Sequence, residues 1–380
     1  MTAEHNAPES NPIVYYNALH PLAEVSGHEE RTGRYISAAL ERMGIARVDH
    51  VGGHGVVATI DSGAPGPCVM FRADMDALPY ANADGSMTAV HACGHDAHCS
   101  MLLAAAGDLV RIVRRGKLKL VFQPGEEDLT GALAMIKDGV LEDVDIAVGA
   151  HIRPLSDIPA GSMTAEVTHV ACATIGVRFI GATAHASRPH QGVNPIDMAA
   201  SYIGMVNSIH LDPNASWSTK ATRINGEPGV YNNTSGWCEV FFDLRAQTNP
   251  LLERMLEMMN TMAQSTALAY GGRLEIKQID YCPASDYDPE LVAMIKSCIV
   301  EELGADRLAP ATGGGGEDFH FYKVKKPSVR TAYFGVGVGA APGLHKRDMT
   351  FQTQYLVNGV RLWKDIARRL LGDGQAACRP

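Results

Sequence analysis

The spacing of apolar residues in the first 150 positions predicts strands that alternate with helices. Apolar residues recur at helical spacing between positions 12 and 43, and again between 97 and 113. Short apolar runs at 117–123 and 146–150 have the length and composition of buried strands. Because strands that alternate with helices form sheets covered on both faces, we expect an α/β domain with a mixed, mostly parallel sheet.

The segment from 172 to 282 has a different order of predicted elements. Asn194 and Pro195 are a typical helix start, and Gly271 is a typical helix end. The predicted order is β-α-β-β-α-β, which is the ferredoxin-like pattern. We therefore expect an α+β domain at 172–282, inserted into the larger domain at 1–171 and 283–380.

Composition and charge exclude two classes of function. The chain of 380 residues has 33 Lys and Arg against 42 Asp and Glu, a net charge of −9. This composition provides no basic face for phosphates, so we expect no nucleic-acid partner. The longest apolar runs, such as 101–106, are far shorter than the roughly 20 residues of a membrane-spanning helix, so we expect no membrane partner.

The eight cysteines indicate a reducing compartment. They are spread along the chain without CxxC pairs, and no N-terminal segment combines a basic start with an apolar stretch. Because disulfide frameworks and secretion signals are typical of exported proteins, we expect a cytoplasmic location.

The segment HACGHDAH at 91–98 has the highest density of chemically versatile side chains. It holds one thiol, three imidazoles and one carboxylate within eight residues. Gly94 gives the backbone the freedom to bring Cys93 and His95 to one metal ion. The alternative is a solvated polar turn ahead of a helix, with Asp96 as the N-cap.

Two adjacent carboxylates follow the predicted strand at 117–122. Neighbouring residues at the end of a strand point in different directions, so we expect one of Glu126 and Glu127 to bind a metal and the other to face the substrate. This division suits metal-dependent hydrolysis, in which a free carboxylate takes the proton of a water molecule. The alternative is a pair of acidic residues that open a helix and interact with its dipole.

Other polar side chains are expected at the same edge of the sheet. Asp74 and His151 each follow a predicted strand, as Glu126 does, and the carboxyl ends of parallel strands meet at one edge. His345 lies in a Gly/Ala-rich loop from which its imidazole could reach this edge. For His151 the alternative is a histidine whose hydrogen bonds are satisfied in the core.

Seven segments together resemble peptidase family M20, and most closely its amidohydrolase branch, subfamily D, which contains aminoacylases, hippurate hydrolases and indole-acetyl-amino-acid hydrolases. The segment HACGHDAH, with its cysteine, is specific to that branch. The resemblance covers residues from about 12 to 370 and implies a zinc-peptidase-like catalytic domain with an inserted lid. The segments, in chain order, are RADMDALP, HACGHDAH, QPGEE, AHIRP, GATAHASRPHQGVNP, GGGGEDF and GLH.

The resemblance also implies the residues of a catalytic metal site. His185 reaches toward the active site in similar dimeric enzymes, sometimes from the partner subunit, and would help to hold the oxyanion. Glu126 matches the general base, and Asp76 matches an acid that orients a ligand. Regions that contact the substrate match Asn233, Arg245 and the loop with Gly314 and Gly315, and Arg153 could hold a substrate carboxylate. The implied metal ligands are Cys93, His95, Glu127, His151 and His345.

The expected function is hydrolysis of the amide bond of N-acyl amino acids or related small amides. One or two divalent ions per chain, Mn²⁺ or Zn²⁺ with Co²⁺ or Ni²⁺ as alternatives, would activate a water molecule whose proton Glu126 takes. Two alternatives on the same scaffold are a hydrolytic deaminase and an aromatic-amide or dipeptide hydrolase. A catalytically silent binding protein is a third alternative, against which the complete ligand set argues.

The inserted domain is also the expected site of assembly. Its exposed helix and strand edge offer a surface for a second copy of the chain. We therefore expect a homodimer, or an oligomer built from dimers, formed through the lid.

Overall fold

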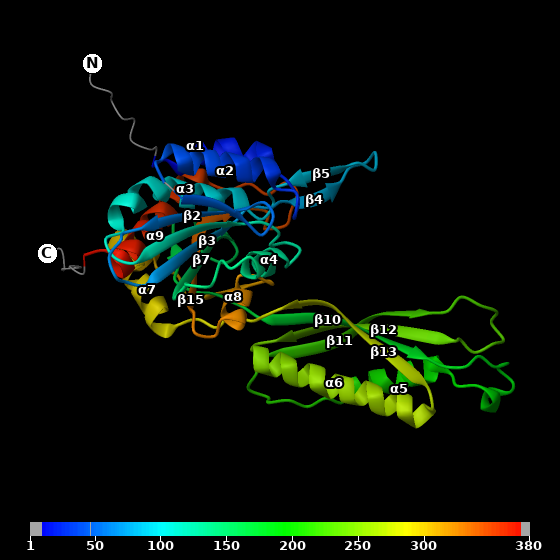
Figure 1. Cartoon of the computed structure of the whole chain (residues 1–380). Coiled ribbons are helices and arrows are strands. Elements are labelled where there is room, and N and C mark those ends of the chain that lie inside the picture. The colour runs from blue at the N-terminus through cyan, green and yellow to red at the C-terminus, as the bar shows by residue number, and fades with distance from the viewer. Residues whose placement is uncertain (1–9, 46, 374–380) are drawn as a thin grey trace, which may run out of the picture. The chain divides into compact units, whose positions relative to one another are not determined.

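The computed structural model describes residues 10–45 and 47–373, which form two compact units (Figure 1). The second unit is His169–Ser285, and the first comprises the described residues before and after it. Each unit has a hydrophobic core of its own. The expected inserted segment, 172–282, lies within the second unit, whose bounds are three residues further out at each end. None of the described helices combines the length and the hydrophobicity that a membrane span requires.

A mixed sheet of seven strands forms the centre of the first unit. Its strands are β1 (Arg47–Val51), β2 (Gly55–Asp61), β3 (Cys68–Asp74), β6 (Lys117–Gln123), β7 (Ile146–Pro154), β8 (Met163–Thr164) and β15 (Arg330–Ala340). They lie in the order β1-β2-β6-β3-β7-β15-β8. The four strands from β6 to β15 are parallel to one another, and antiparallel pairs flank them. The predicted α/β class with a mixed sheet is confirmed.

Helices cover both faces of this sheet (Figure 1). One face packs against α1 (Pro12–Leu19), α2 (Glu30–Arg42), α3 (His95–Ile112), α7 (Pro289–Leu303) and α9 (Leu356–Leu371). On this face Trp363 of α9 packs against Phe71 and Phe334, with ring centroids 4.5 and 4.8 Å apart. The other face carries α4 (Gly131–Lys137) and α8 (His320–Lys325). Short elements complete the unit: η1 (His20–Leu22), η3 (Ala305–Arg307), η4 (Thr353–Tyr355), the hairpin of β4 (Leu78–Ala81) and β5 (Met87–Val90), and the pair of β14 (Thr312–Gly314) and β9 (Val167–His169), whose last residue begins the second unit.

The second unit is a four-stranded antiparallel sheet with two helices. Its elements are β10 (Ala171–Ile180), η2 (Pro189–Gln191), α5 (Pro195–Asn207), β11 (Trp217–Gly226), β12 (Trp237–Ala246), α6 (Asn249–Tyr270) and β13 (Arg273–Cys282). The strand order is β11-β12-β10-β13, which confirms the predicted ferredoxin-like arrangement. The side chain of Asn194 caps α5 by accepting from the N–H of Ile196, and α6 ends at Gly271, which has a φ of +73°.

The main difference from the prediction is the length of β7. The strand continues beyond Ala150, so His151 and Arg153 lie within it, opposite Gly335 and Gly337 of β15. A Cβ atom at Gly335 would lie 2.8 Å from Cγ of Arg153, so the glycine leaves room for the arginine stem. The pairing with β15 therefore extends the strand past the end of the apolar run.

Candidate metal centre

The predicted metal ligands lie together at one end of the central sheet. They come from the start of α3, from the turn that follows β6, from β7 and from the loop after β15. Each belongs to a group of three residues whose ligand atoms all lie within 4.8 Å of one another. These groups are Cys93–His95–His151, Cys93–Glu127–His345 and His95–Glu126–Glu127.

Gly94 sets the direction of the two ligands on either side of it. It is the N-cap of α3 and has a φ of +88°, in the left-handed region that side chains disfavour. A Cβ atom at this position would lie 2.2 Å from Cδ1 of Ile152. Both constraints require glycine, which lets Cys93 and His95 turn toward the same point, with Cys93 Sγ 3.4 Å from Nε2 of His151.

Hydrogen bonds fix which nitrogen of two predicted ligand histidines faces the centre. Nδ1 of His95 donates to Oδ1 of Asp76 at 2.9 Å, and Nδ1 of His151 donates to the carbonyl of Ile152 at 2.5 Å. In the neutral form of each ring, the proton on Nδ1 leaves a lone pair on Nε2. Burial lowers the pKa of His95, but the charge on Asp74 outweighs it and raises this pKa well above its usual range, so a cation at Nε2 of His95 would displace a proton. Both imidazoles therefore present an acceptor atom to a cation.

His98 supports the centre and cannot ligate it. Its Nδ1 donates to Oδ1 of Asp74 at 2.5 Å, and its Nε2 accepts from the N–H of Ile152 at 2.8 Å. Because both nitrogens are engaged, His98 instead holds β7 beside His151. His91 is also buried, and neither of its nitrogens has a hydrogen-bond partner among the described residues.

Asp76 connects three parts of the chain. Besides the bond from His95, its carboxylate accepts from the N–H of Glu127 at 3.0 Å and from the hydroxyl of Ser26 at 2.7 Å. Burial alone would raise the pKa of Asp76, but the hydrogen bond from His95 lowers it, so the group is an anion. It orients His95 and the turn that carries Glu127 at the same time.

The two adjacent glutamates face the same imidazole, contrary to the expectation that they point in different directions. Oε2 of Glu126 and Oε1 of Glu127 lie 3.9 and 3.8 Å from Nε2 of His95. The backbone forms a turn here, in which the N–H of Leu129 donates to the carbonyl of Glu126 and Leu129 has a φ of +56°. The alternation expected of a strand therefore does not apply.

Burial and crowding of like charge change the acidity of both glutamates. Burial, followed by the charge on Glu317, raises the pKa of Glu126 well above its usual range. Burial raises the pKa of Glu127 to about 7. Both carboxyl groups are thus easily protonated unless positive charge is near.

His345 is held beside the other ligands by its backbone. Its N–H donates to the carbonyl of Ala92 at 2.8 Å, and its φ of +60° is uncommon for a residue with a side chain. Nε2 lies 3.6 Å from Oε2 of Glu127, while 56% of the side chain is exposed. The ligand group therefore includes one imidazole at the solvent side.

The donor set fits a divalent cation. Nε2 of His95 and Oε1 of Glu127 are buried, 3.8 Å apart, and without a hydrogen-bond partner among the described residues. A buried polar atom without a partner costs about 1–3 kcal/mol, and a cation between the two atoms would remove that cost. Thiolate, imidazole and carboxylate ligands suit Zn²⁺, and oxygen and nitrogen ligands also suit Mn²⁺. Burial raises the pKa of the Cys93 thiol, so its ionisation is coupled to cation binding.

A buried arginine contacts the acidic residues next to the site. Arg72 is fully buried and donates to Oδ2 of Asp74 and Oδ1 of Asp318, both at 2.7 Å, and its Nη2 lies 3.0 Å from Glu317. Ligand atoms of Glu317, Asp318 and Glu126 lie within 4.8 Å of one another. The guanidinium thus offsets part of the negative charge behind Glu126. Sequence reasoning assigned no role to Arg72, Glu317 or Asp318, although an arginine inside the apolar strand β3 was a signal.

The predicted substrate contacts are divided between the two units. In the first unit, Arg153 is buried and donates to Asp157 and to the carbonyl of Gly313, the latter at 2.5 Å. Gly313 and the predicted Gly314 belong to β14, and Gly315 follows it, so this segment is partly a strand and not only a loop. The structure thus brings Arg153 to the glycine-rich segment.

The remaining predicted residues belong to the second unit, and the structure describes them only within it. Residues His185 and Asn233 form a backbone bridge. Nδ1 of His185 accepts from the N–H of Ser187 at 3.2 Å. Arg245 donates twice to Asp243, at 3.0 and 2.9 Å.

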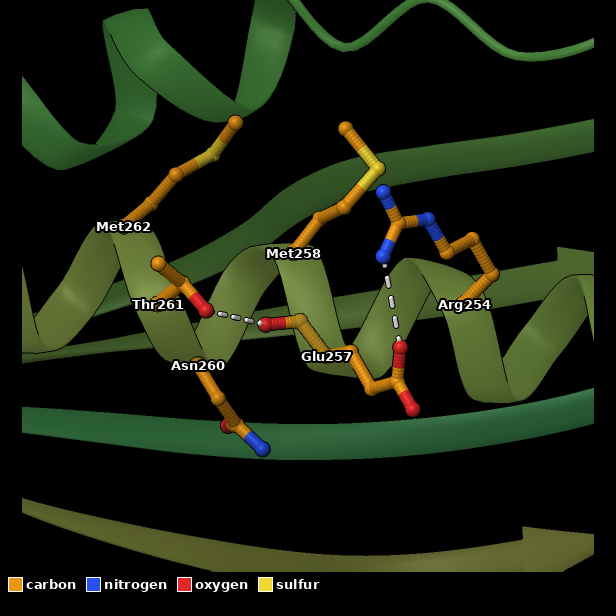
Figure 2. A pocket seen from close by; sticks show the side chains of 6 residues that line it. All are labelled: Arg254, Glu257, Met258, Asn260, Thr261 and Met262. Atoms are coloured by element: carbon orange, nitrogen blue, oxygen red, sulfur yellow. Dashed lines mark hydrogen bonds and ion pairs between the residues drawn. The ribbon is translucent and has the colours of Figure 1, made fainter.

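An open groove of about 630 Å³ runs along α6 in the second unit (Figure 2). Met258 and Met262 point to one side of it, while Arg254 donates to Glu257 at 3.4 Å. Its lining contains none of the predicted site residues. The residues that line it are Arg254, Glu257, Met258, Asn260, Thr261 and Met262.

Glu29 supports the turn that carries the two site glutamates. It is fully buried, and its Oε1 accepts from the N–H of Gly125 at 2.7 Å. Oε2 has no hydrogen-bond partner among the described residues. Burial, with the charge on Asp76, raises the pKa of Glu29 to about 7. Sequence reasoning missed this residue, because an acidic residue before a helix is common.

The raised pKa of Glu29 predicts a pH dependence of stability. The folded protein keeps this proton up to about pH 7, whereas the unfolded chain loses it near pH 4.5, so the stabilisation present in acid is lost as the pH rises. When the pH is raised from about 5 to about 8, the free energy of unfolding should fall in both metal-free proteins. The fall should be smaller in Glu29→Gln than in the wild type, by about 1–3 kcal/mol. Urea unfolding at both pH values measures this difference. The neighbouring variant Glu30→Gln is the control, and an equal pH dependence in Glu29→Gln and wild type would contradict the assignment.

Comparison with known proteins agrees with this geometry. Residues 70–369 match the sequence family described as Peptidase family M20/M25/M40. The chain is 30% identical over 333 residues to one of the chains of the p-aminobenzoyl-glutamate hydrolase of Escherichia coli, covering 80% of this chain and 74% of that protein. It is 28% identical over 370 residues to N-acetyl-L-cysteine deacetylase of Bacillus subtilis, covering 94% and 87%. A solved dinuclear metal-binding peptidase of the M20 family from Bacillus subtilis has a TM-score of 0.78 at 25% identity and covers 95% and 97%. The chain therefore belongs to peptidase family M20, as its sequence motifs predicted.

Proposed function

We propose that this chain is a metal-dependent hydrolase that cleaves the amide bond of N-acyl amino acids or related small amides. Two of its relatives are named for such reactions, one on p-aminobenzoyl-glutamate and the other on N-acetyl-L-cysteine. The observation that carries the proposal is the pair of buried, unpartnered ligand atoms on His95 and Glu127, with the carboxylate of Glu126 beside them.

The first unit provides the metal site in this proposal. One or two divalent ions are held, Zn²⁺ or Mn²⁺ in preference to Co²⁺ or Ni²⁺, because the donors combine a thiol with imidazoles and carboxylates. When bound, the ion polarises the amide carbonyl and lowers the pKa of a water molecule. Asp76 keeps His95 in the required tautomer and orientation. The proposed ligands are Cys93, His95, Glu127, His151 and His345.

Glu126 is the proposed general base. Its carboxylate lies at the ligand group, and burial raises its pKa, which suits a group that must take and return a proton near neutral pH. It takes the proton of the attacking water and delivers it to the leaving nitrogen. Glu127, with its backbone N–H held by Asp76, stays in the ligand set.

The second unit acts as a lid in this proposal. Nδ1 of His185 accepts a hydrogen bond from the N–H of Ser187, so in the neutral ring Nε2 carries the proton. Nε2 lies 3.5 Å from Nδ2 of Asn232 and is the proposed donor to the developing oxyanion. Asn233, the bridge partner of His185, and Arg245 contact the substrate. In the first unit, Arg153 is the proposed partner of a substrate carboxylate, and through the carbonyl of Gly313 it also holds the segment that contains Gly314 and Gly315.

A metal-reconstitution experiment tests the reaction class. Chelated protein should be inactive, and protein reloaded with Mn²⁺ or Zn²⁺ should hydrolyse members of a panel of N-acetyl, N-benzoyl and indole-acetyl amino acids. Amine release and metal content by mass spectrometry are the measurements. Hydrolysis of dipeptides alone would favour the peptidase alternative, and a metal-loaded protein inactive on all amides would contradict the proposal.

Substitution of Glu126 tests its role. Glu126→Gln removes the base but preserves shape and hydrogen-bonding capacity, so we expect kcat to fall by about 10²–10⁴ or more with metal content unchanged. Asp128→Asn, an exposed position in the same turn, is the matched control and should retain activity. Activity of Glu126→Gln equal to that of the control would remove the general-base assignment.

A homodimer formed through the second unit is also part of the proposal. The groove along α6 is open, and Ile224 of the edge strand β11 is 56% exposed, so both surfaces can accept a second copy. We expect a dimer in analytical ultracentrifugation, whereas a monomer at micromolar concentration would contradict this part. A cytoplasmic location fits the seven cysteines of the described residues, none of which forms a disulfide.

A further inference from the structure

Two thiols lie opposite each other on neighbouring strands of the sheet in the second unit. The antiparallel register of β10 and β13 pairs Cys172 directly with Cys282. Directly opposite residues of antiparallel strands have Cα atoms about 4.5 or 5.5 Å apart. Both values lie within the range of about 4.4–6.8 Å that a disulfide spans, so a bond between these residues needs no shift of the strands.

The two cysteines differ in accessibility and acidity. Cys172 is partly exposed, whereas Cys282 is fully buried. Arg245 of β12 is the register partner of Cys172 on its other side. A hydrogen bond from Cys282 and the charge on Arg245 lower the pKa of Cys172, against the effects of burial, Asp280 and Asp243. Cys172 is therefore the accessible thiol that ionises more readily, and Cys282 lies behind it.

We propose that Cys172 and Cys282 form a redox-active dithiol site that reacts with small-molecule disulfides. The thiolate of Cys172 attacks one sulfur of the small disulfide, forms a mixed disulfide and releases the other half as a thiolate. Cys282 then loses its proton to solvent, attacks the sulfur of Cys172 and releases the second half as a thiolate. The protein dithiol loses two electrons, and the small disulfide is reduced to two thiols.

The site is independent of the proposed metal centre. Its cysteines belong to the second unit, whereas Cys93 belongs to the first. Cys172 is the fourth residue of the second unit, and Cys282 is the fourth from its end. Oxidation would therefore join the two strands through which the chain enters and leaves this unit.

Reaction of the full-length reduced protein with glutathione disulfide tests the site. After thiols are blocked and the protein is digested, mass spectrometry should find a Cys172–Cys282 link in the wild type. Cys282→Ser should instead retain glutathione on Cys172, because the second attack is missing. Cys172→Ser should give neither product. Cys238→Ser, a buried position of β12 in the same sheet, should form the link as the wild type does.

Two results would overturn the proposal. One is stable glutathione on Cys172 of the wild type without the internal link, and the other is modification of Cys282 in Cys172→Ser at the wild-type rate. Phenylarsine oxide, which bridges two neighbouring thiols, gives a test that needs no variant. It should protect Cys172 and Cys282 together from alkylation in the reduced wild type, and protection of neither would also contradict the pair.

Discussion

The carboxylate of Asp76 is the constraint on which the geometry of the metal centre depends. It accepts hydrogen bonds from His95, from the backbone of Glu127 and from Ser26, which belong to three separate parts of the sequence. Each bond is charge-assisted, and the carboxylate itself is buried, so the three segments are held in one arrangement. Loss of this carboxylate would release two proposed ligands together.

In this part of the first unit, the carboxylates outnumber the cationic side chains that could neutralise them. Arg72 is surrounded by Asp74, Glu317 and Asp318, and the site glutamates lie close by. Such crowding is unfavourable in a poorly solvated interior, as the raised pKa values of Glu126 and Glu127 indicate. The fold therefore holds carboxylates close enough to repel one another, and a divalent cation would reduce this repulsion. Affinity for the ion is thereby linked to the stability of the protein.

Local chemistry made much of the fold predictable. Asn194 with Pro195 and the glycine at 271 mark helix ends by their own conformational preferences, so both ends were predicted correctly. The extension of β7 through His151 was missed because it depends on pairing with β15, about 180 residues later in the chain. Tertiary contacts of this kind cannot be predicted from the local spacing of apolar and polar residues.

In the candidate site, too, contacts between residues distant in sequence were not predicted. Segment HACGHDAH predicted metal chemistry, but spacing alone did not separate His95 from His98, whose nitrogens are occupied by Asp74 and the backbone of β7. The hydrogen bond by which Glu29 supports the turn at Gly125 could not be predicted from the sequence either, because the two residues are distant in the chain.

His345 gives the proposed centre an order of assembly. It lies 194 residues beyond His151, and the whole second unit is encoded between them. During synthesis the other four ligands leave the ribosome first, and the loop that carries His345 is made only after the inserted unit is complete. Full coordination is thus a property of the finished chain, because no nascent chain that ends before His345 contains all five proposed ligands.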